Sequence, residues 1–550
     1  MQGLIMDVPL LTSMIVKHAA AWHGDVEIVT HRVEGDMHRY TYADAYKRMC
    51  RLANALARLG IQQGDRVGTM AWTTYRHFEL YFGIGGSGSV IHTINPRLFP
   101  DQIVYIINHA QDRVMFIDTT WVEMMEGLQD QCPTIEKFVI LCDSGKMPET
   151  SLRNAVCYED LLAAEDDTFD WPEFDEKTAV ALCYTSGTTG NPKGVLYTHR
   201  AMVLHAIAGT SSDHPLCIDS RTILLPAVSM FHVHGWMVPY AAPISGTKLV
   251  LPGPHMHGDN ICRLLEEEKV TVTAGVPTIW IGVLEHLKKT GAKLPHLKIC
   301  NIGGSAPSLA MIKAFEEDHG VAVVHAWGMT ELSAAGTTGR LRQRHQDLPA
   351  NERYKVQQTQ GRPLFGFEVK IVDLDGTRLP HDGEAVGQMF VRGPWVAAAY
   401  FEDEAATEAA FDAEGWFGTG DMASISSDGL VRVSDRSKDL IKSGGEWISS
   451  IDLENYALTH PDVVEAAAIA VKHPKWEERP LLVIVPRQGA TVTPDSIRAV
   501  LAEHVAKWWL PDDIVFVEEI PHTATGKISK KDLREHFADY RWPETAGVAE

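Results

Sequence analysis

Helical and strand-like segments alternate along the first four-fifths of this chain, and this alternation restricts the fold more than any other feature. Residues 42–59 carry small and apolar side chains at helical spacing and end at Gly60, and residues 65–71 then follow a strand pattern. Further strands are predicted at residues 177–183, 269–273, 296–302 and 321–325. Strands that alternate with helices in this way are typical of α/β architecture.

Loops with small or polar residues follow several of these strands. Pro277 suits the first turn of the helix after one strand, and Ser308 is a candidate N-cap after Gly303 and Gly304. In open α/β sheets, ligands collect at the carboxyl ends of the strands. One such loop alone could be a plain turn, but several loops with polar tips favour a shared binding site.

The length of the chain predicts more than one domain, because 550 residues exceed what a single hydrophobic core usually serves. After Gly366, repeated Asp-Gly turn signals predict the short strands of a β-rich subdomain. The sequence becomes strongly charged at residues 435–442, and helix and strand patterns beyond them predict a small α+β domain. We therefore expect a large N-terminal domain of α/β sheets plus a β-rich subdomain over residues 1–436, and a small domain over residues 437–550.

Composition limits the partners that this chain can bind. Its formal net charge of -22 repels polyanions, so we do not expect it to bind nucleic acid. We expect neither a signal peptide, because the first residues lack a basic lead-in, nor a membrane span, because no apolar run is long enough. The eight cysteines are scattered without a C-x-x-C pair, which favours reduced thiols and a cytoplasmic location.

A run of six small residues forms the clearest candidate for a phosphate-binding loop. Its members are Thr185, Ser186, Gly187, Thr188, Thr189 and Gly190. Glycines let backbone N–H groups approach an anion, hydroxyls add donors, and the nearby Lys193 adds a positive charge. The common P-loop has the pattern G-x-x-x-x-G-K-[ST]. The spacing in this run differs from that pattern and therefore excludes a common P-loop. A plain surface turn is the alternative for the cluster alone.

The segment around this loop, YTSGTTGNPKGV at residues 184–195, closely resembles the signature of the acyl-adenylate-forming superfamily. Four further segments resemble motifs of that superfamily in the expected order: HAWGMTELS at 325–333, FGTGDM at 417–422, DRSKDLIK at 435–442 and PHTATGKISK at 521–530. The resemblance therefore covers essentially the whole chain. It implies an enzyme that uses ATP and Mg²⁺ to convert a carboxylic acid to an acyl-adenylate, and then passes the acyl group to coenzyme A.

The resemblance also assigns roles to individual residues. Lys527 matches the lysine that bridges the acyl carboxylate and the α-phosphate, Thr330 would bind that phosphate, and Asp421 would accept both ribose hydroxyls. Glu331 and the Thr185 hydroxyl would contact magnesium, which prefers hard oxygen ligands. The full set expected at ATP or AMP is Thr185, Ser186, Gly187, Thr188, Thr189, Gly190, Lys193, Ser305, Ala326, Trp327, Thr330, Asp421, Arg436, Lys438, Lys442 and Trp447.

Two of these positions carry further expectations. Trp327 stands where the family commonly has a tyrosine, so stacking on adenine survives and any phenol hydrogen bond is lost. Lys438 matches a hinge about which the small domain rotates between the two half-reactions, so that domain should be mobile. After rotation, the coenzyme A tunnel would be faced by Ser443, Gly444 and Gly445.

The acyl pocket is less sharply defined by the sequence. His232 matches a histidine near the acyl carboxylate, and Trp236 resembles a tryptophan that gates the acyl channel, although a core aromatic is the alternative. The H-x-H pair formed with His234 lacks an evident third ligand, so we do not expect it to hold a metal. The candidate wall residues are His232, Trp236, Val276, Pro277, Gly303, Gly304 and Ala334. A monocarboxylic, rather apolar acid fits these side chains best.

The chain as a whole is most similar to bacterial medium-chain fatty acyl-CoA ligases and to related ligases acting on 3-(methylthio)propionate. We expect that thioether acid as the substrate, with medium-chain fatty acids as the alternative and a homodimer implied by the same resemblance. Three rival classes share these motifs. A peptide-synthetase adenylation domain, a luciferase-like oxygenase and a non-catalytic AMP-binding module are ranked lower, the last because Lys527, Glu331 and Thr330 are all present.

Overall fold

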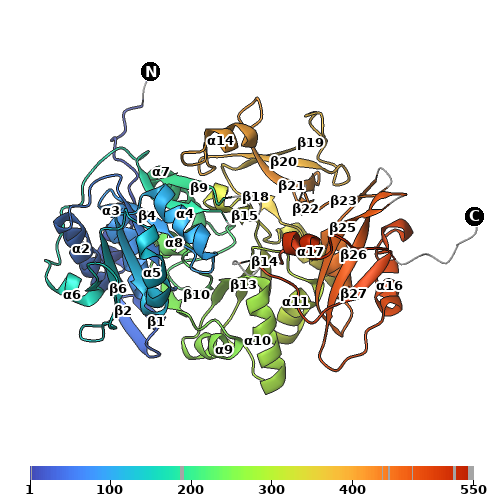
Figure 1. The fold of residues 1–550 in the computed structure, drawn as a ribbon, viewed down its shortest axis with the longest axis horizontal. Coiled ribbons are helices and arrows are strands. Elements are labelled where there is room, and N and C mark those ends of the chain that lie inside the picture. The colour runs from blue at the N-terminus through green and yellow to red at the C-terminus, as the bar shows by residue number, and fades with distance from the viewer. Residues whose placement is uncertain are drawn as a thin grey trace, which may run out of the picture.

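The computed structural model describes residues 1, 3–185, 191–436, 438–443, 446–473, 475–523 and 528–542. Within them, two large sheets and a smaller antiparallel sheet form the N-terminal part, and a further mixed sheet forms the C-terminal part (Figure 1). This confirms the predicted α/β class with a large and a small domain.

The first large sheet contains seven described strands in the order β14-β13-β12-β10-β11-β1-β2. Their bounds are β14 Ala322–His325, β13 Ile299–Ile302, β12 Val272–Gly275, β10 Ile223–Ala227, β11 Lys248–Leu251, β1 Glu27–His31 and β2 Met37–Thr41. All neighbours pair in parallel except β1 and β2, which form an antiparallel hairpin at the edge. The carboxyl ends of β12, β13 and β14 therefore lie side by side.

The second large sheet also has seven described strands, in the order β7-β6-β5-β3-β4-β8-β9. Their bounds are β7 Val156–Cys157, β6 Lys137–Leu141, β5 Val114–Asp118, β3 Arg66–Met70, β4 Val90–Thr93, β8 Ala179–Tyr184 and β9 Gly194–Thr198. Helix α3 (Tyr75–Gly86) contacts β1 of the first sheet and β3 and β8 of the second, and all of its residues are buried. The main core of the large domain therefore lies between these two sheets.

The other helices of the large domain pack mainly either beside α3 in the core between the two sheets or on the far face of one sheet. Their bounds are α1 Thr12–Trp22, α2 Tyr42–Arg58, α4 Pro100–Ala110, α5 Val122–Leu128, α6 Tyr158–Ala163, α7 His199–Gly209, α8 Val238–Ser245, α9 Gly258–Glu267, α10 Pro277–Thr290, α11 Leu309–Lys313, α12 Gln343–Gln346 and α13 Ala350–Gln358. Among the described residues, no helix combines the length and the apolar run that a membrane crossing needs.

The β-rich subdomain is the antiparallel sheet β19-β20-β21-β22, with α14 (Glu404–Ala410) beside it. Its strands are β19 Glu368–Val372, β20 Gly387–Arg392, β21 Phe417–Ile425 and β22 Val431–Arg436. The C-terminal sheet has the order β24-β23-β26-β25, with β27 parallel to β26. Its elements are β23 Ile441–Ser443, β24 Glu446–Ile448, α15 Ser450–Ala457, β25 Val463–His473, β26 Glu477–Pro486, α16 Pro494–Ala502, β27 Asp513–Phe516 and α17 Lys530–His536.

Local sequence signals set several of these boundaries. The Thr41 hydroxyl accepts a hydrogen bond from the Asp44 N–H and caps α2, and Pro277 begins α10 as expected. The Ser308 side chain caps α11. The strand predicted at 269–273 was misplaced, because Lys269 has φ +53° in the turn before β12.

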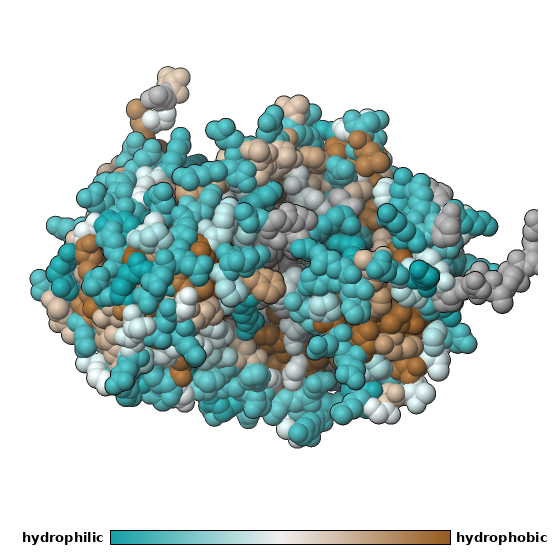
Figure 2. Space-filling view, viewed as in Figure 1, coloured by the Kyte–Doolittle hydropathy of each residue, from teal (hydrophilic) through white to brown (hydrophobic). Residues whose placement is uncertain are grey.

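The surface of the face shown in Figure 2 is mainly hydrophilic. This agrees with a chain that has 72 acidic and 50 basic residues.

Candidate active site

The stem of the predicted phosphate loop lies at the end of β8. The Thr185 N–H donates to the Lys193 carbonyl oxygen over 2.9 Å, and the Lys193 N–H donates to Thr185 Oγ1 over 3.1 Å. These two bonds close the stem on either side of residues 186–190. The predicted residues Ser186, Gly187, Thr188, Thr189 and Gly190 lie outside the described part of the chain.

A short 3₁₀ turn, η5 (Thr330–Leu332), carries the predicted phosphate and magnesium residues. Tyr197 Oη donates to the Thr330 carbonyl oxygen over 2.5 Å. Tyr400 Oη donates to Glu331 Oε1 over 2.7 Å, and the Ala397 N–H donates to the Glu331 carbonyl oxygen over 2.7 Å. Glu331 is only 5% exposed, so its carboxylate direction is fixed by the protein rather than by water.

The predicted ribose carboxylate, Asp421, lies on β21 and is almost fully buried. Its Oδ2 accepts a hydrogen bond of 3.0 Å from Trp327 Nε1, and its Oδ1 lies 2.9 Å from Arg436 Nε. Arg436 Nη1 also donates to the Thr419 carbonyl oxygen over 3.2 Å. The tryptophan at position 327 therefore brings a hydrogen bond of its own, which we did not expect from the sequence.

The structure thus brings two predicted groups to neighbouring strand ends. The residue before Trp327, Ala326, follows β14, and Gly303 follows β13, the strand beside it. A Cβ atom built on Gly303 would lie 3.0 Å from Trp236 Cη2 and 3.2 Å from the Ala326 carbonyl oxygen. The indole of Trp236 therefore rests directly on the Gly303 backbone.

The segment that carries Trp236 has an uncommon backbone. In η3 (Val233–Met237), every residue has a positive φ, from +28° to +65°. Only Gly235 among them adopts such angles without a steric cost. This left-handed turn begins directly after His232 and contains His234.

The two histidines meet different surroundings. His232 is half-buried, and its ring lies 4.8 Å from that of Phe231. His234 is fully buried, with its ring 4.3 Å from that of Tyr197, and burial lowers its pKa to about 3. Its ring nitrogens have no hydrogen-bond partner within the described residues. His234 is thus a neutral core residue, whereas the His232 side chain is partly open to solvent.

The remaining acyl-pocket candidates lie around the same strand ends. Val276 and Pro277 follow β12, and the Gly303 N–H donates to the Gly275 carbonyl oxygen over 3.3 Å. Ala334 is buried on β16 (Ala334–Ala335). Gly304 is exposed beside the adenine candidate Ser305.

Residues predicted on the small domain meet partners of that domain. Lys442 Nζ lies 3.4 Å from Glu477 Oε2, and Arg479 Nη1 donates to Ser443 Oγ over 3.1 Å. Trp447 is 40% exposed and Lys438 is exposed near the start of the domain. The predicted residues Gly444, Gly445 and Lys527 lie outside the described residues.

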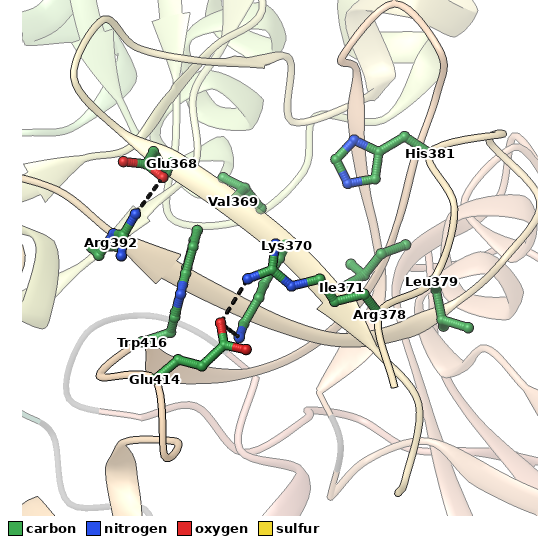
Figure 3. A pocket seen from close by; sticks show the side chains of 10 residues that line it. All are labelled: Glu368, Val369, Lys370, Ile371, Arg378, Leu379, His381, Arg392, Glu414 and Trp416. Atoms are coloured by element: carbon green, nitrogen blue, oxygen red, sulfur yellow. Dashed lines mark hydrogen bonds and ion pairs between the residues drawn. The ribbon is translucent and has the colours of Figure 1, made fainter. Parts of the chain in front are cut away.

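A separate hollow of about 430 Å³ opens on the antiparallel sheet and contains none of the predicted site residues (Figure 3). One of its lining residues is Trp416, whose ring lies 4.9 Å from Lys370 Nζ and 4.5 Å from Arg392 Cζ. Glu414 and Glu368 already pair with these two cations. We therefore do not assign a ligand to this hollow.

Tyr197 and Tyr400 are site residues that the sequence did not indicate. Each lies in a different segment from the residue it holds, at separations of 133 and 69 positions. Tyr197 lies two residues after the end of the phosphate signature, on β9, and this proximity was the one signal in the sequence.

Comparisons with known proteins agree with this geometry. The family model of the AMP-binding enzyme matches residues 16–401, and the model of the AMP-binding enzyme C-terminal domain matches residues 452–527. A 3-methylmercaptopropionyl-CoA ligase of Ruegeria lacuscaerulensis is 46% identical over 541 residues, covering 98% of this chain and 99% of the relative. A medium-chain-fatty-acid–CoA ligase of Ectopseudomonas oleovorans is 42% identical over 550 residues, covering 100% of this chain and 100% of the relative. Among solved structures, the anthranilate CoA ligase AuaEII with anthranoyl-AMP has a TM-score of 0.85 at 24% identity, covering 96% of this chain and 98% of that chain.

Proposed function

This chain belongs to the AMP-binding enzyme family, and we propose that it joins 3-(methylthio)propionate to coenzyme A with ATP. In the first step, a carboxylate oxygen attacks the α-phosphorus, the bond from that phosphorus to the bridging oxygen breaks, and pyrophosphate leaves. In the second step, the coenzyme A thiol attacks the acyl carbonyl, loses its proton, and AMP leaves. Attack of one anion on another requires fixed positive charge and donors around the phosphates.

The arrangement that carries this proposal is the meeting of Asp421, Trp327 and Arg436. A buried carboxylate held from two sides is well suited to accept both hydroxyls of a ribose. The adjoining indole offers a flat apolar face to the adenine. These contacts would fix the orientation of the bound nucleotide relative to Thr330. Thr330 follows Trp327 by three residues and would contact the α-phosphate.

Magnesium fits the oxygen donors of this chain. The Glu331 carboxylate and the Thr185 hydroxyl are hard oxygen ligands of the kind that Mg²⁺ binds together with phosphate oxygens. We propose that these two residues hold it, and that the bound ion neutralises charge on the phosphates. Lys193 would add positive charge at the loop, and Lys527 would bridge the acid and the α-phosphate.

The identity of the acid rests on similarity and on the apolar wall. The relative named for 3-methylmercaptopropionate is 46% identical to this chain, and the medium-chain relative is 42% identical. Medium-chain fatty acids are therefore the second candidate substrate. Trp236 against Gly303 offers an apolar surface that suits a thioether or a short alkyl chain.

A panel of acids tests the proposal. Propionate, methylthiopropionate, C4 to C16 fatty acids and benzoate are each assayed for AMP formation with ATP, with and without coenzyme A. The highest kcat/KM is expected for methylthiopropionate. A higher value for octanoate selects the second candidate, and AMP formation with no acid contradicts the proposal. Oxygen uptake with a luciferin would indicate a luciferase-like enzyme, and nucleotide binding without turnover would indicate an AMP-binding module.

We also propose a domain boundary at Ser437, a cytoplasmic location and a homodimer. The boundary is supported by the end of β22 at Arg436 and the start of β23 at Ile441. The location is supported by eight free cysteines, of which all but Cys217 are buried. Light scattering of the purified chain tests the homodimer.

A further inference from the structure

We propose that Tyr400 is a positioning residue for the ATP step: its hydroxyl directs the Glu331 carboxylate and its ring seats the Lys193 ammonium. This inference rests on the proposed function, because it assigns these two charges to the metal and the phosphates of ATP. It concerns residues that are brought together only by the fold.

The hydroxyl contact is short and buried. Tyr400 Oη donates to Glu331 Oε1 over 2.7 Å, and the two residues are 9% and 5% exposed. A hydrogen bond to an ionised acceptor is stronger than one between neutral groups. Glu331 keeps further lone pairs for a metal ion while one direction of its carboxylate is fixed.

The ring of Tyr400 contacts a positively charged group, the ammonium of Lys193. Lys193 Nζ lies 4.8 Å from the centre of the Tyr400 ring, within the range of a cation–π interaction. The next residue, Phe401, donates its N–H to the Gly194 carbonyl oxygen over 2.8 Å. A Cβ atom on Gly194 would lie 3.1 Å from Phe401 Cβ, so the two segments are in close backbone contact. Tyr400 therefore approaches the end of the phosphate loop at a fixed distance.

Tyr197 has a related position but a different task. Its hydroxyl binds the backbone carbonyl of Thr330, the residue before Glu331, and thus holds the η5 turn in place. Tyr400 instead contacts the charged end of a side chain. Loss of the Tyr197 hydroxyl should therefore loosen the turn, whereas loss of the Tyr400 hydroxyl should act on the metal requirement.

The test uses two substitutions of one residue and a matched control. Tyr400→Phe removes the hydroxyl and keeps the ring, and Tyr400→Leu removes both. The control is Tyr354→Phe on α13, because Tyr354 Oη also donates to a glutamate, Glu317, over 2.9 Å and is 2% exposed. Each full-length variant is titrated by calorimetry with ATP in excess Mg²⁺ and with ATP in EDTA. The Mg²⁺ dependence of ATP–pyrophosphate exchange is measured beside it.

Tyr400→Phe is expected to raise the Mg²⁺ concentration for half-maximal exchange about 10- to 100-fold, the usual loss when a residue that orients a metal ligand is changed. Its affinity for ATP in EDTA should match the unsubstituted chain. Tyr400→Leu should in addition weaken ATP binding in EDTA by about 3- to 30-fold, because Lys193 loses its cation–π contact with the aromatic ring. Tyr354→Phe should leave both titrations unchanged.

Two results would overturn the role of Tyr400. One is a Tyr400→Phe chain with unchanged Mg²⁺ dependence and unchanged affinity for MgATP. The other is an equal loss of ATP affinity with and without Mg²⁺ together with a lowered melting temperature, which would indicate a purely structural role. The calorimetry needs no acid, so an error in the proposed substrate would leave this test intact.

Discussion

Replacing Gly303 with Ala should displace the Trp236 indole and reduce activity toward the acid. A Cβ atom at position 303 would lie 3.0 Å from Trp236 Cη2 and 3.2 Å from Cζ3. Packed carbon atoms lie about 3.5–4.0 Å apart, so the ring must move by a few tenths of an ångström. The Ala326 carbonyl oxygen, at 3.2 Å, belongs to the backbone and has little room to give way.

The size of the effect follows from the cost of overpacking. Inserting a methyl group into a well-packed site typically costs about 1–3 kcal/mol. If that cost falls on the bound acid, kcat/KM for the acid falls about 5- to 150-fold. The KM for ATP should change less than that for the acid, because two of the three atoms nearest to the inserted methyl group belong to Trp236.

Initial rates of AMP formation at varied acid and varied ATP measure the two effects separately. Trp236→Phe removes the ring atoms that meet the new Cβ atom, so Gly303→Ala should cost much less in that background, and the double-mutant cycle should show coupling. Gly127→Ala is the control, because a Cβ atom at that position in α5 meets nothing within 4 Å. Equal losses from Gly303→Ala in both backgrounds, or equal effects on acid and ATP, would refute the reasoning.

Three further changes test other parts of the molecule. Trp327→Phe keeps a stacking ring but removes the hydrogen bond to Asp421, so the KM for ATP should rise about tenfold or more, given about 1.5–3 kcal/mol for a bond to a charged group; an unchanged KM contradicts this. Burial raises the pKa of Asp118 to about 7, so the stability that its bound proton adds is present at pH 4 and lost as the pH rises through 7. Asp118→Asn, which keeps an acceptor for the Trp72 N–H, should therefore raise the melting temperature at pH 8 and reduce its change between pH 4 and 8. Lys527→Ala should abolish ATP–pyrophosphate exchange yet largely spare thioester formation from preformed acyl-adenylate, and equal loss of both would refute that division.

The elements that the sequence predicted well are those with local signals. The helix expected at 42–59 is α2, Tyr42–Arg58, because its cap and its apolar spacing lie within the segment itself. The strand expected at 65–71 is β3, Arg66–Met70. Phosphate-loop, ribose and metal candidates were identified because each belongs to a short contiguous motif.

Features that depend on distant pairing could not be found in this way. The hairpin β1–β2 joins the first sheet through β11, more than two hundred residues later, and no local pattern marks that partner. Tyr400 has an ordinary sequence context, and its contact with Glu331 exists only because the antiparallel subdomain packs against the η5 turn. The hydrogen bond from Trp327 to Asp421 likewise depends on β21 lying beside the loop after β14.

The contacts around the two site carboxylates bear on the rotation of the small domain that the family resemblance implies. Asp421 is held by Trp327 and by Arg436, the last residue of β22, and Glu331 is held by Tyr400. All of these residues lie within 1–436, so rotation about the following segment leaves their hydrogen bonds intact. We infer that the small domain exchanges the groups that face a prebuilt site, and that Lys527 is the charge that arrives and departs with it.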